Sequence, residues 1–310
     1  MRDTGQSPPP PPERRVPGVS PSLRAWARLL FRMLTLLSPA LAARYAARLF
    51  VHPRSRPVTG AEERFLRSAR THRLASAQGA VQVYEWPAAG PSVLVVHGWI
   101  SHAGRMQTII EALHAEGLRI IAFDAPAHGR SAGRHADLQR FVTALAAVSA
   151  AFGPIDGLLA HSMGAMAAIT WLAEDPAAAH VLAAVFVGMP RDVGYLFDSF
   201  VVTLQLRADV RERLRALFRA RYGRTPEQFS ARDLARTLRV PVLLVHGTQD
   251  DLVPLEHAHE NLVGLNGGQL HVAHGLNHSA PLRDPATVAL MVRFLSERLK
   301  SSAVRTALAH

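Results

Sequence analysis

Three residues that lie far apart in the sequence could together perform nucleophilic catalysis. Ser162, Asp250 and His278 each come shortly after a run of apolar residues. A serine hydroxyl is a weak nucleophile until a base removes its proton as the new bond forms. A histidine can take that proton, and a carboxylate can fix the tautomer of the imidazole and stabilise its cation. If the fold brings these side chains together, they predict attack on an acyl carbon through an acyl-enzyme intermediate.

The residues around Ser162 predict a sharp turn from a strand into a helix. Ala160 and Gly164, two positions before and after the serine, are small, and a bulky side chain there would collide with neighbouring backbone. The turn would lift the hydroxyl above the sheet. It would also place the N-terminus of the next helix, with its unpaired N–H groups, beside a developing oxyanion. Such a pattern is frequent by chance, so its meaning depends on motifs elsewhere in the chain.

A second motif supplies donors for that oxyanion. His97-Gly98-Trp99 follows an apolar run, and a glycine at the end of a strand allows the next N–H to turn toward the site. We predict that the N–H groups of Trp99 and Met163 form the oxyanion hole. His97 is expected to hold loops together by hydrogen bonds, although His97 and His161 are also candidates for the lining of a substrate pocket.

These motifs resemble those of the α/β-hydrolase superfamily, and the resemblance covers about residues 80–300. Residues 160–164 resemble its nucleophile elbow, and residues 97–99 resemble its oxyanion loop. Residues 247–254 are similar to its acid turn and residues 277–279 to its histidine loop. Residues 123–131 resemble a turn that has a structural role in the superfamily. The order serine, acid, histidine along the chain is also that of the superfamily. Ala160 and Ala127 stand where glycine is commoner in the superfamily. Because alanine is also small, Ala160 should cost the turn at Ser162 little stability, whereas Ala127 is expected to shift its own turn.

The resemblance implies a fold and an activity. The fold is α/β, with a mostly parallel central sheet, helices on both faces and a small helical cap insertion. The implied activity is that of a serine hydrolase of the esterase or lipase type, with Ser162 as the nucleophile.

The resemblance also selects the acid among its neighbours. In the resembled turn the acid lies three residues after Gly247 and four before Pro254, which selects Asp250 over Asp251. Some members of the superfamily instead carry the acid after the preceding strand, and Asp192 is the alternative at that place.

The base is chosen by its position relative to the strand before it. The chain has sixteen histidines, so the presence of a histidine near a motif in the sequence is not evidence that it is the catalytic base. His274 follows the expected strand too closely, and His271 lies within it. His278, on the loop beyond, is therefore the predicted general base.

Short apolar runs alternate with longer helical patterns from about residue 80, which indicates βα units and a mostly parallel sheet. Expected strands cover residues 81–86, 92–96, 119–123, 157–161, 181–187, 240–246 and 269–273. Expected helices cover residues 103–115, 136–151, 164–172, 255–263 and 285–299. The expected organisation is a hydrolase core at 80–190 and 240–300, a cap at 191–239 and a C-terminal tail at 301–310. Each candidate catalytic residue then follows the carboxyl end of a strand, where parallel sheets bind their ligands.

The segment 191–239 is helical in pattern and too long for an ordinary connection, so it is expected to form the cap. A cap closes over the nucleophile and shapes the substrate pocket. Its apolar residues Leu196, Phe197 and Phe200 indicate a pocket for an acyl chain. The same residues could form the core of the cap itself, and both interpretations stay open.

Most of the formal net charge of +11 lies near the N-terminus, because residues 1–73 contain fourteen arginines and four acidic residues. Residues 1–21 include a proline run and are expected to be a disordered tail. Residues 22–79 are expected to be a basic helical extension, with an amphipathic first helix. Arginines interrupt that stretch too often for a transmembrane span. Its apolar face can pack on the domain, or residues 22–56 can lie on an anionic membrane surface.

The composition excludes several kinds of chemistry. The chain has no cysteine, so disulfides and a thiolate nucleophile are excluded, and outside its N-terminal part it is nearly neutral, which gives no sign of nucleic-acid binding. The expected substrate is a small molecule with a carboxylic ester, thioester or lactone, cleaved without a metal or organic cofactor. The expected location is the cytoplasm, with peripheral contact at the inner face of the membrane. The alternatives are a C–C bond or amide hydrolase and a non-catalytic binding protein; the oligomeric state is left open.

Overall fold

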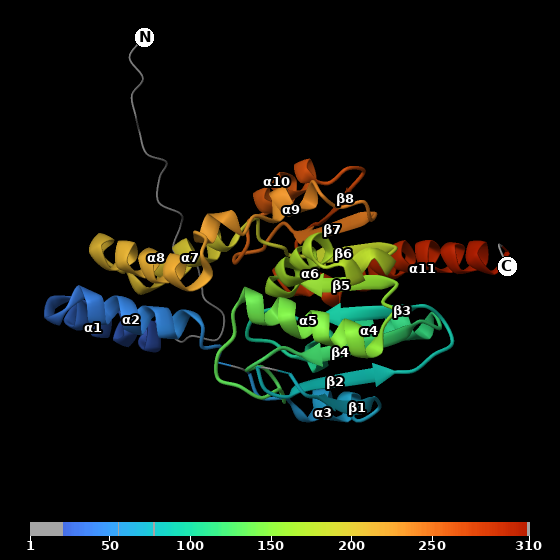
Figure 1. Ribbon diagram of the computed structural model, residues 1–310, viewed down its shortest axis with the longest axis horizontal. Helices are drawn as coiled ribbons and strands as arrows, with labels where there is room; N and C mark the ends of the chain where they lie inside the picture. Colours follow the sequence, from blue (N-terminus) through green and yellow to red (C-terminus); the bar gives the residue numbers. More distant parts are fainter. Residues whose placement is uncertain (1–20, 55, 77, 309–310) are drawn as a thin grey trace, which may run out of the picture.

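One sheet forms the centre of the structure. The computed structural model describes residues 21–54, 56–76 and 78–308. Within these residues an eight-stranded sheet has the order β1-β2-β4-β3-β5-β6-β7-β8 (Figure 1). The strands are β1 (Arg70–Leu74), β2 (Val81–Trp86), β3 (Ser92–Val96), β4 (Arg119–Asp124), β5 (Gly157–His161), β6 (Ala183–Val187), β7 (Val242–Gly247) and β8 (Gln269–Ala273). β1 and β2 run antiparallel to their neighbours and the other pairs are parallel, which confirms the expected α/β class.

Helices cover both faces of the sheet. One face carries α5 (Leu138–Phe152), α6 (Met163–Glu174), α9 (Ala231–Ala235) and α10 (Glu256–Gly264), and the other carries α3 (Gly60–Leu66), α4 (Gln107–Ala115) and α11 (Pro285–Leu308). Short 3₁₀ helices are η1 (Ala103–Met106), η2 (Pro176–His180), η3 (Pro226–Gln228) and η4 (Ala280–Leu282). Alternate residues of a strand point to opposite faces, so Leu94 and Val96 join one core whereas Val93 and Val95 join the other.

The core begins earlier than the expected boundary at residue 80. β1 pairs with β2 along its whole length, from Arg70 opposite Glu85 to Leu74 opposite Val81. Thr59 begins α3 with a reciprocal capping box to Glu62. The N-terminal extension therefore does not reach residue 79. β1 is a polar edge strand, which lacks the apolar pattern of a buried strand and so gave no signal in the sequence.

The C-terminal boundary also differs from the expectation. α11 continues to Leu308, so the tail expected at 301–310 is helical over most of its length. No glycine or proline follows Pro285 within this helix, and nothing in its sequence would stop it. The tail expected at residues 1–21 lies almost wholly outside the described residues.

The cap and the N-terminal helices form one projecting lobe. The cap contributes α7 (Val193–Leu204) and α8 (Ala208–Tyr222), as the helical pattern of residues 191–239 indicates, and the N-terminal part forms a hairpin of α1 (Pro21–Leu37) and α2 (Pro39–Phe50). α2 packs on α8 and α1 packs on α7, at one end of the molecule in Figure 1. The lobe has its own apolar core, which includes Phe31, Ala42, Ala43, Ala46, Phe197, Val201, Leu204, Val210 and Leu214. Among the described residues, no helix is both long enough and apolar enough to cross a membrane.

Candidate active site

Ser162 occupies a strained turn between β5 and α6. Its backbone has φ of 55° and ψ of −120°, a conformation that residues with a side chain rarely adopt. The Ser162 N–H donates to the carbonyl of Val187 at 2.8 Å, which ties the turn to the end of β6. A Cβ atom at Gly164 would lie 2.3 Å from the carbonyl oxygen of His97, so α6 can approach β3 only with glycine there. This local geometry is the one that the small residues around the serine predict.

The oxyanion loop packs directly against this turn. A Cβ atom at Gly98 would lie 3.0 Å from the Cβ of Ser162, so the loop needs glycine for its close approach. Met163 is the first residue of α6, where a backbone N–H has no carbonyl partner within the helix. The N–H of Ile100 donates to His128 at 3.2 Å, whereas among the described residues the N–H of Trp99 has no protein acceptor. The predicted donors are thus both free to bind an oxyanion.

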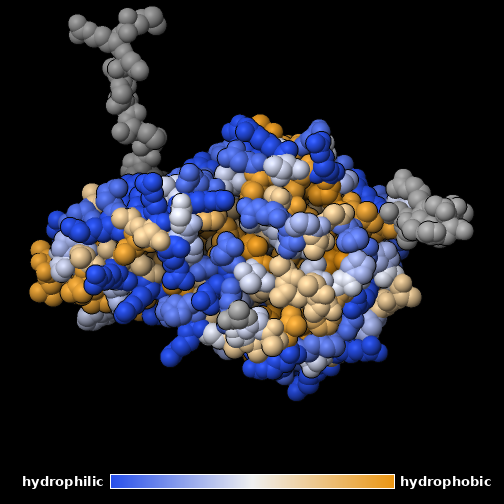
Figure 2. Space-filling model, viewed as in Figure 1, coloured by the Kyte–Doolittle hydropathy of each residue, from blue (hydrophilic) through white to orange (hydrophobic). Residues whose placement is uncertain are grey.

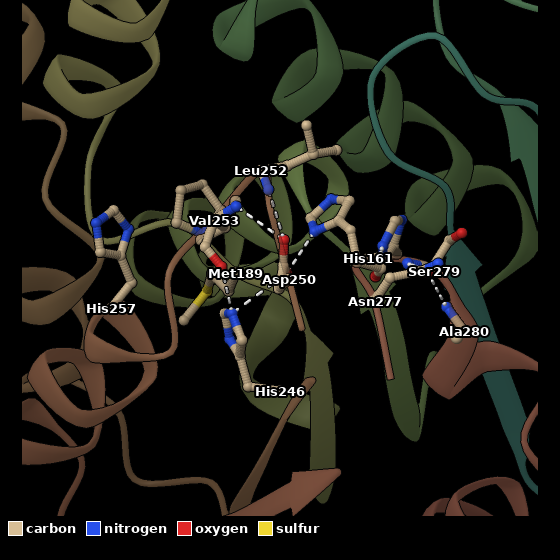
Figure 3. Close-up of polar contacts among 12 residues, drawn as sticks. His161, Met189, His246, Asp250, Leu252, Val253, His257, Asn277, Ser279 and Ala280 are labelled. Atoms are coloured by element: carbon tan, nitrogen blue, oxygen red, sulfur yellow. Dashed lines mark hydrogen bonds and ion pairs between the residues drawn. The ribbon is translucent and has the colours of Figure 1, made fainter. Parts of the chain in front are cut away.

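Asp250 and His278 form a hydrogen-bonded pair at the ends of β7 and β8. Nδ1 of His278 lies 2.7 Å from Oδ2 of Asp250, and the carboxylate requires the proton on that nitrogen. Oδ1 of Asp250 accepts from the N–H groups of Leu252 and Val253 at 3.0 and 2.8 Å (Figure 3). The Asp250 side chain is buried and the His278 side chain is only partly so. In the neutral imidazole with its proton on Nδ1, the second nitrogen, Nε2, carries a lone pair that can act as a base.

Hydrogen bonds keep Asp250 ionised in spite of its burial. Burial acts to raise its pKa, but hydrogen bonds from His246 and His278 outweigh this and hold the pKa well below the usual range. Nε2 of His246 lies 2.8 Å from the carbonyl oxygen of Val253 and 3.3 Å from Oδ2 of Asp250. His246 was not among the residues predicted from the sequence, and its place at the end of the strand before the acid turn was the available signal.

Two further contacts position the imidazole of His278 near the nucleophile turn. Nε2 of His161, the residue before Ser162, lies 3.0 Å from the backbone carbonyl of His278, and the two rings are 4.7 Å apart between centroids. Gly188 has φ of +58°, and a Cβ there would lie 3.0 Å from Cε1 of His278. Within the described residues the Ser162 hydroxyl makes no hydrogen bond to protein, and such bonds commonly tighten only when substrate binds.

The alternative acids and bases lie elsewhere or have other roles. Asp192 caps the N-terminus of α7 by accepting from the N–H of Tyr195 at 2.6 Å, and burial raises its pKa to about 6. Asp251 and His274 are exposed, and His271 lies within β8. Among the described residues no hydrogen bond or ion pair links any of these side chains to the nucleophile turn, whereas Asp250 and His278 are bonded to each other beside it.

Several expected pocket residues are parts of the packed interior. His97 is fully buried and accepts from the N–H of Ala125 at 2.9 Å, which is the structural role expected for it. Phe197 is buried in the core of the lobe with its ring against Phe50 of α2, and Phe200 contacts the same ring. Phe197 and Phe200 therefore pack in the core of the lobe, which is one of the two interpretations that the sequence leaves open, and a role in lining an acyl pocket stays a prediction. Leu196 is partly buried and His161 lies beside the nucleophile turn.

The turn after β4 has a structural function. The buried carboxylate of Asp124 accepts from the N–H groups of Ala103 and Arg130, both at 2.8 Å, and from the hydroxyl of Tyr84 at 3.0 Å. Ala127 adopts φ of 63° in this turn, a left-handed conformation that strains a residue with a Cβ atom. Among the described residues no group of side chains could hold a metal ion.

Comparisons with known proteins show which family and which solved structures this chain is similar to. Residues 88–236 match the family described as serine aminopeptidase, S33. A monoacylglycerol lipase from Mycolicibacterium smegmatis is 30% identical over 225 residues, which cover 59% of this chain and 80% of the lipase. The esterase Pf2001 of Pyrococcus furiosus is 19% identical with a TM-score of 0.61, covering 80% of this chain and 99% of the esterase. The carboxylesterase CesB of Bacillus subtilis is 16% identical with a TM-score of 0.55, covering 76% and 95% of the two chains. The two solved structures support the fold.

Proposed function

Because this chain belongs to the α/β-hydrolase superfamily, we propose that it cleaves carboxylic esters with Ser162 as nucleophile, His278 as base and Asp250 as orienting acid. The observation that carries the proposal is the 2.7 Å contact between His278 and Asp250. The loop that bears His278 also contacts the strained turn at Ser162, because Nε2 of His161 lies 3.0 Å from the backbone carbonyl of His278. A buried carboxylate behind a partly exposed imidazole, beside a serine in a positive-φ turn, is the arrangement that nucleophilic acyl transfer requires.

The proposed reaction has two halves. Nε2 of His278 takes the proton of the Ser162 hydroxyl while the oxygen bonds to the ester carbon, and the N–H groups of Trp99 and Met163 stabilise the oxyanion by about 3 kcal/mol each. Collapse of the intermediate breaks the bond to the alcohol, which receives the proton from His278. Water then gives a proton to the same nitrogen as it attacks the acyl-enzyme. The products are an alcohol and a carboxylic acid, and Ser162 regains its proton.

We propose a fatty acyl ester as the substrate class, because a monoacylglycerol lipase is 30% identical to this chain over 80% of the lipase's length. Phe197 and Phe200 pack within the lobe, so we expect other residues around the turn at Ser162 to contribute to the acyl site. A thioester or lactone presents the same acyl carbon and would follow the same steps.

The test is a panel of p-nitrophenyl esters with acyl chains of increasing length, run beside a fluorophosphonate probe. The wild type should label with the probe and show an optimum chain length, and Ser162→Ala should do neither. Ser301→Ala, an exposed serine on α11, is the matched control and should behave as the wild type. Labelling of Ser162→Ala would remove this serine from its role, and an unlabelled wild type without turnover across the panel would favour a binding protein.

A further inference from the structure

One face of the α1–α2 hairpin remains exposed although the hairpin packs on the cap. The exposed fractions of Trp26, Met33, Leu36, Leu37 and Leu41 are 70, 53, 74, 79 and 53%. Leu29 and Leu30 are also about half exposed. We call these seven residues the apolar ridge. Figure 2 shows hydrophobic atoms gathered at the end of the molecule that the hairpin occupies.

The apolar ridge is not the face of the hairpin that packs against the rest of the lobe. Phe31 and Thr35 of α1 are buried against the lobe, and Arg28 of the same helix donates from Nε to the carbonyl of Thr203 at 3.0 Å. At about 100° per residue, the ridge positions of α1 lie on the side away from Phe31. Packing of the hairpin on the cap therefore leaves these seven apolar side chains in contact with solvent. A contiguous exposed apolar patch commonly marks an interaction surface.

The charges beside the ridge have one sign. No acidic residue occurs between Glu13 and Glu62. The hairpin carries five arginines, at positions 24, 28, 32, 44 and 48. Arg32, Arg44 and Arg48 are exposed and form no salt bridge with another described residue. By contrast, the cap arginines Arg211 and Arg215 pair with Asp198. The hairpin thus presents uncompensated positive charge next to apolar side chains.

We propose that the apolar ridge and its arginines dock on the surface of an anionic lipid bilayer. Leucine, methionine and tryptophan side chains can enter the boundary between headgroups and acyl chains, while arginines bind the anionic headgroups. A second copy of this chain is a poorer occupant, because the same positive charges would face each other. The inference goes beyond the proposed function and does not depend on it.

The test is co-sedimentation of the full chain with vesicles of phosphatidylcholine alone or mixed with phosphatidylglycerol. The wild type should bind the mixed vesicles and dissociate at high salt. Leu36→Ser with Leu37→Ser should weaken binding at least tenfold. Reversal of Arg32, Arg44 and Arg48 to glutamate should weaken it by roughly 100-fold, since each juxtamembrane arginine contributes about a fivefold factor. These positions are exposed, so the variants should keep the melting temperature of the wild type.

Matched controls separate the ridge from general charge and stickiness. Val263→Ser removes an exposed apolar residue from α10, and reversal of Arg64, Arg70 and Arg73 makes the same charge change outside the hairpin. Both controls should bind nearly as the wild type does. The fluorescence of Trp26, the most exposed tryptophan among the described residues, should shift to the blue on binding, and Trp26→Phe should remove the shift.

Three outcomes would overturn the proposal: no binding by the wild type, equal binding by the hairpin variants, or a ridge that instead holds two copies of the chain together. Light scattering without vesicles tests the last, because Leu36→Ser with Leu37→Ser would then convert a dimer to a monomer. Repeating the binding with Ser162→Ala keeps the lipids intact, so failure of docking and failure of the proposed hydrolysis are observed separately.

Discussion

At the scale of single residues, the sequence offers two adjacent carboxylates, Asp250 and Asp251, as the acid. In the structure it is Asp250 that pairs with His278. Asp250 is buried against His278, whereas Asp251 is exposed. Asp250→Asn should lower kcat by about 10⁴ with a small change in KM, because an amide no longer fixes the imidazole tautomer or stabilises its cation. Steady-state ester hydrolysis measures both constants. Asp251→Asn is the matched control and should retain kcat within about twofold; a reversed pattern would assign the acid to residue 251.

Ala127 carries strain that glycine would release. Its φ of 63° lies in the left-handed region, which costs a residue with a Cβ about 1–2 kcal/mol. Glycine removes that cost and adds a smaller one through the greater freedom of the unfolded chain. Ala127→Gly should therefore raise the free energy of unfolding by about 0.5–1 kcal/mol in urea titration. Gly117→Ala, at φ of 79° with open space around it, should lower it instead. A destabilised Ala127→Gly would show that this turn is not strained.

At the scale of elements, the sequence predicts what depends on local pattern and misses what depends on pairing. Seven strands were predicted from apolar runs in the sequence. The turn at Ser162 was predicted from the small residues around it, where neighbouring backbones approach closely. β1 was missed because its residues Arg70–Leu74 are polar, and only pairing with β2 makes them a strand. For Phe197 the sequence left open a pocket and the core of the cap, because no local signal distinguishes a pocket lining from the interface with α2 that buries its ring. His246 was missed because its proximity to Asp250 arises from the turn after β7.

Asp192, which caps the start of α7, should make the free energy of unfolding depend on pH. Burial raises the pKa of Asp192 to about 6, above the value of about 3.9 expected in an unfolded chain. Between about pH 4 and pH 6 the folded chain holds a proton that the unfolded chain has released. The stability that this carboxyl contributes is thus present below pH 4 and lost as pH rises through that window.

Asp192→Asn tests this directly. Asparagine is as good an N-cap as aspartate, so α7 should keep its start while the titration disappears. Urea unfolding at pH 4.5, 5.5 and 7 should show that the variant loses less free energy of unfolding than the wild type as pH rises. Parallel curves for the two proteins would mean that the buried carboxyl does not titrate in this range.

At the scale of the whole molecule, one helix connects the candidate active site with the N-terminal hairpin. At the start of α7 the hydroxyl of Tyr195 donates to the carbonyl of Leu252, beside Asp250, at 2.6 Å. At its end the carbonyl of Thr203 accepts from Arg28 of α1. The twelve residues of α7 extend over about 18 Å, and these two contacts lie about 12 Å apart along the helix. The hairpin is thus part of the support of the cap as well as a candidate docking surface.

Removal of residues 1–56 should therefore weaken the cap and leave the sheet intact. The deletion takes Phe31, Ala42 and Ala46 out of the core that buries Phe197 and Val201, and their exposure costs several kcal/mol by analogy with large core truncations. The β-sheet uses none of the deleted residues, so the far-ultraviolet circular dichroism should keep its strand contribution. We expect a lower melting temperature, stronger binding of a hydrophobic dye and slower ester turnover. The full-length variant Leu36→Ser with Leu37→Ser should change none of these, because its side chains are exposed. A truncated chain with the melting temperature and turnover of the wild type would show that the cap holds its shape without the hairpin.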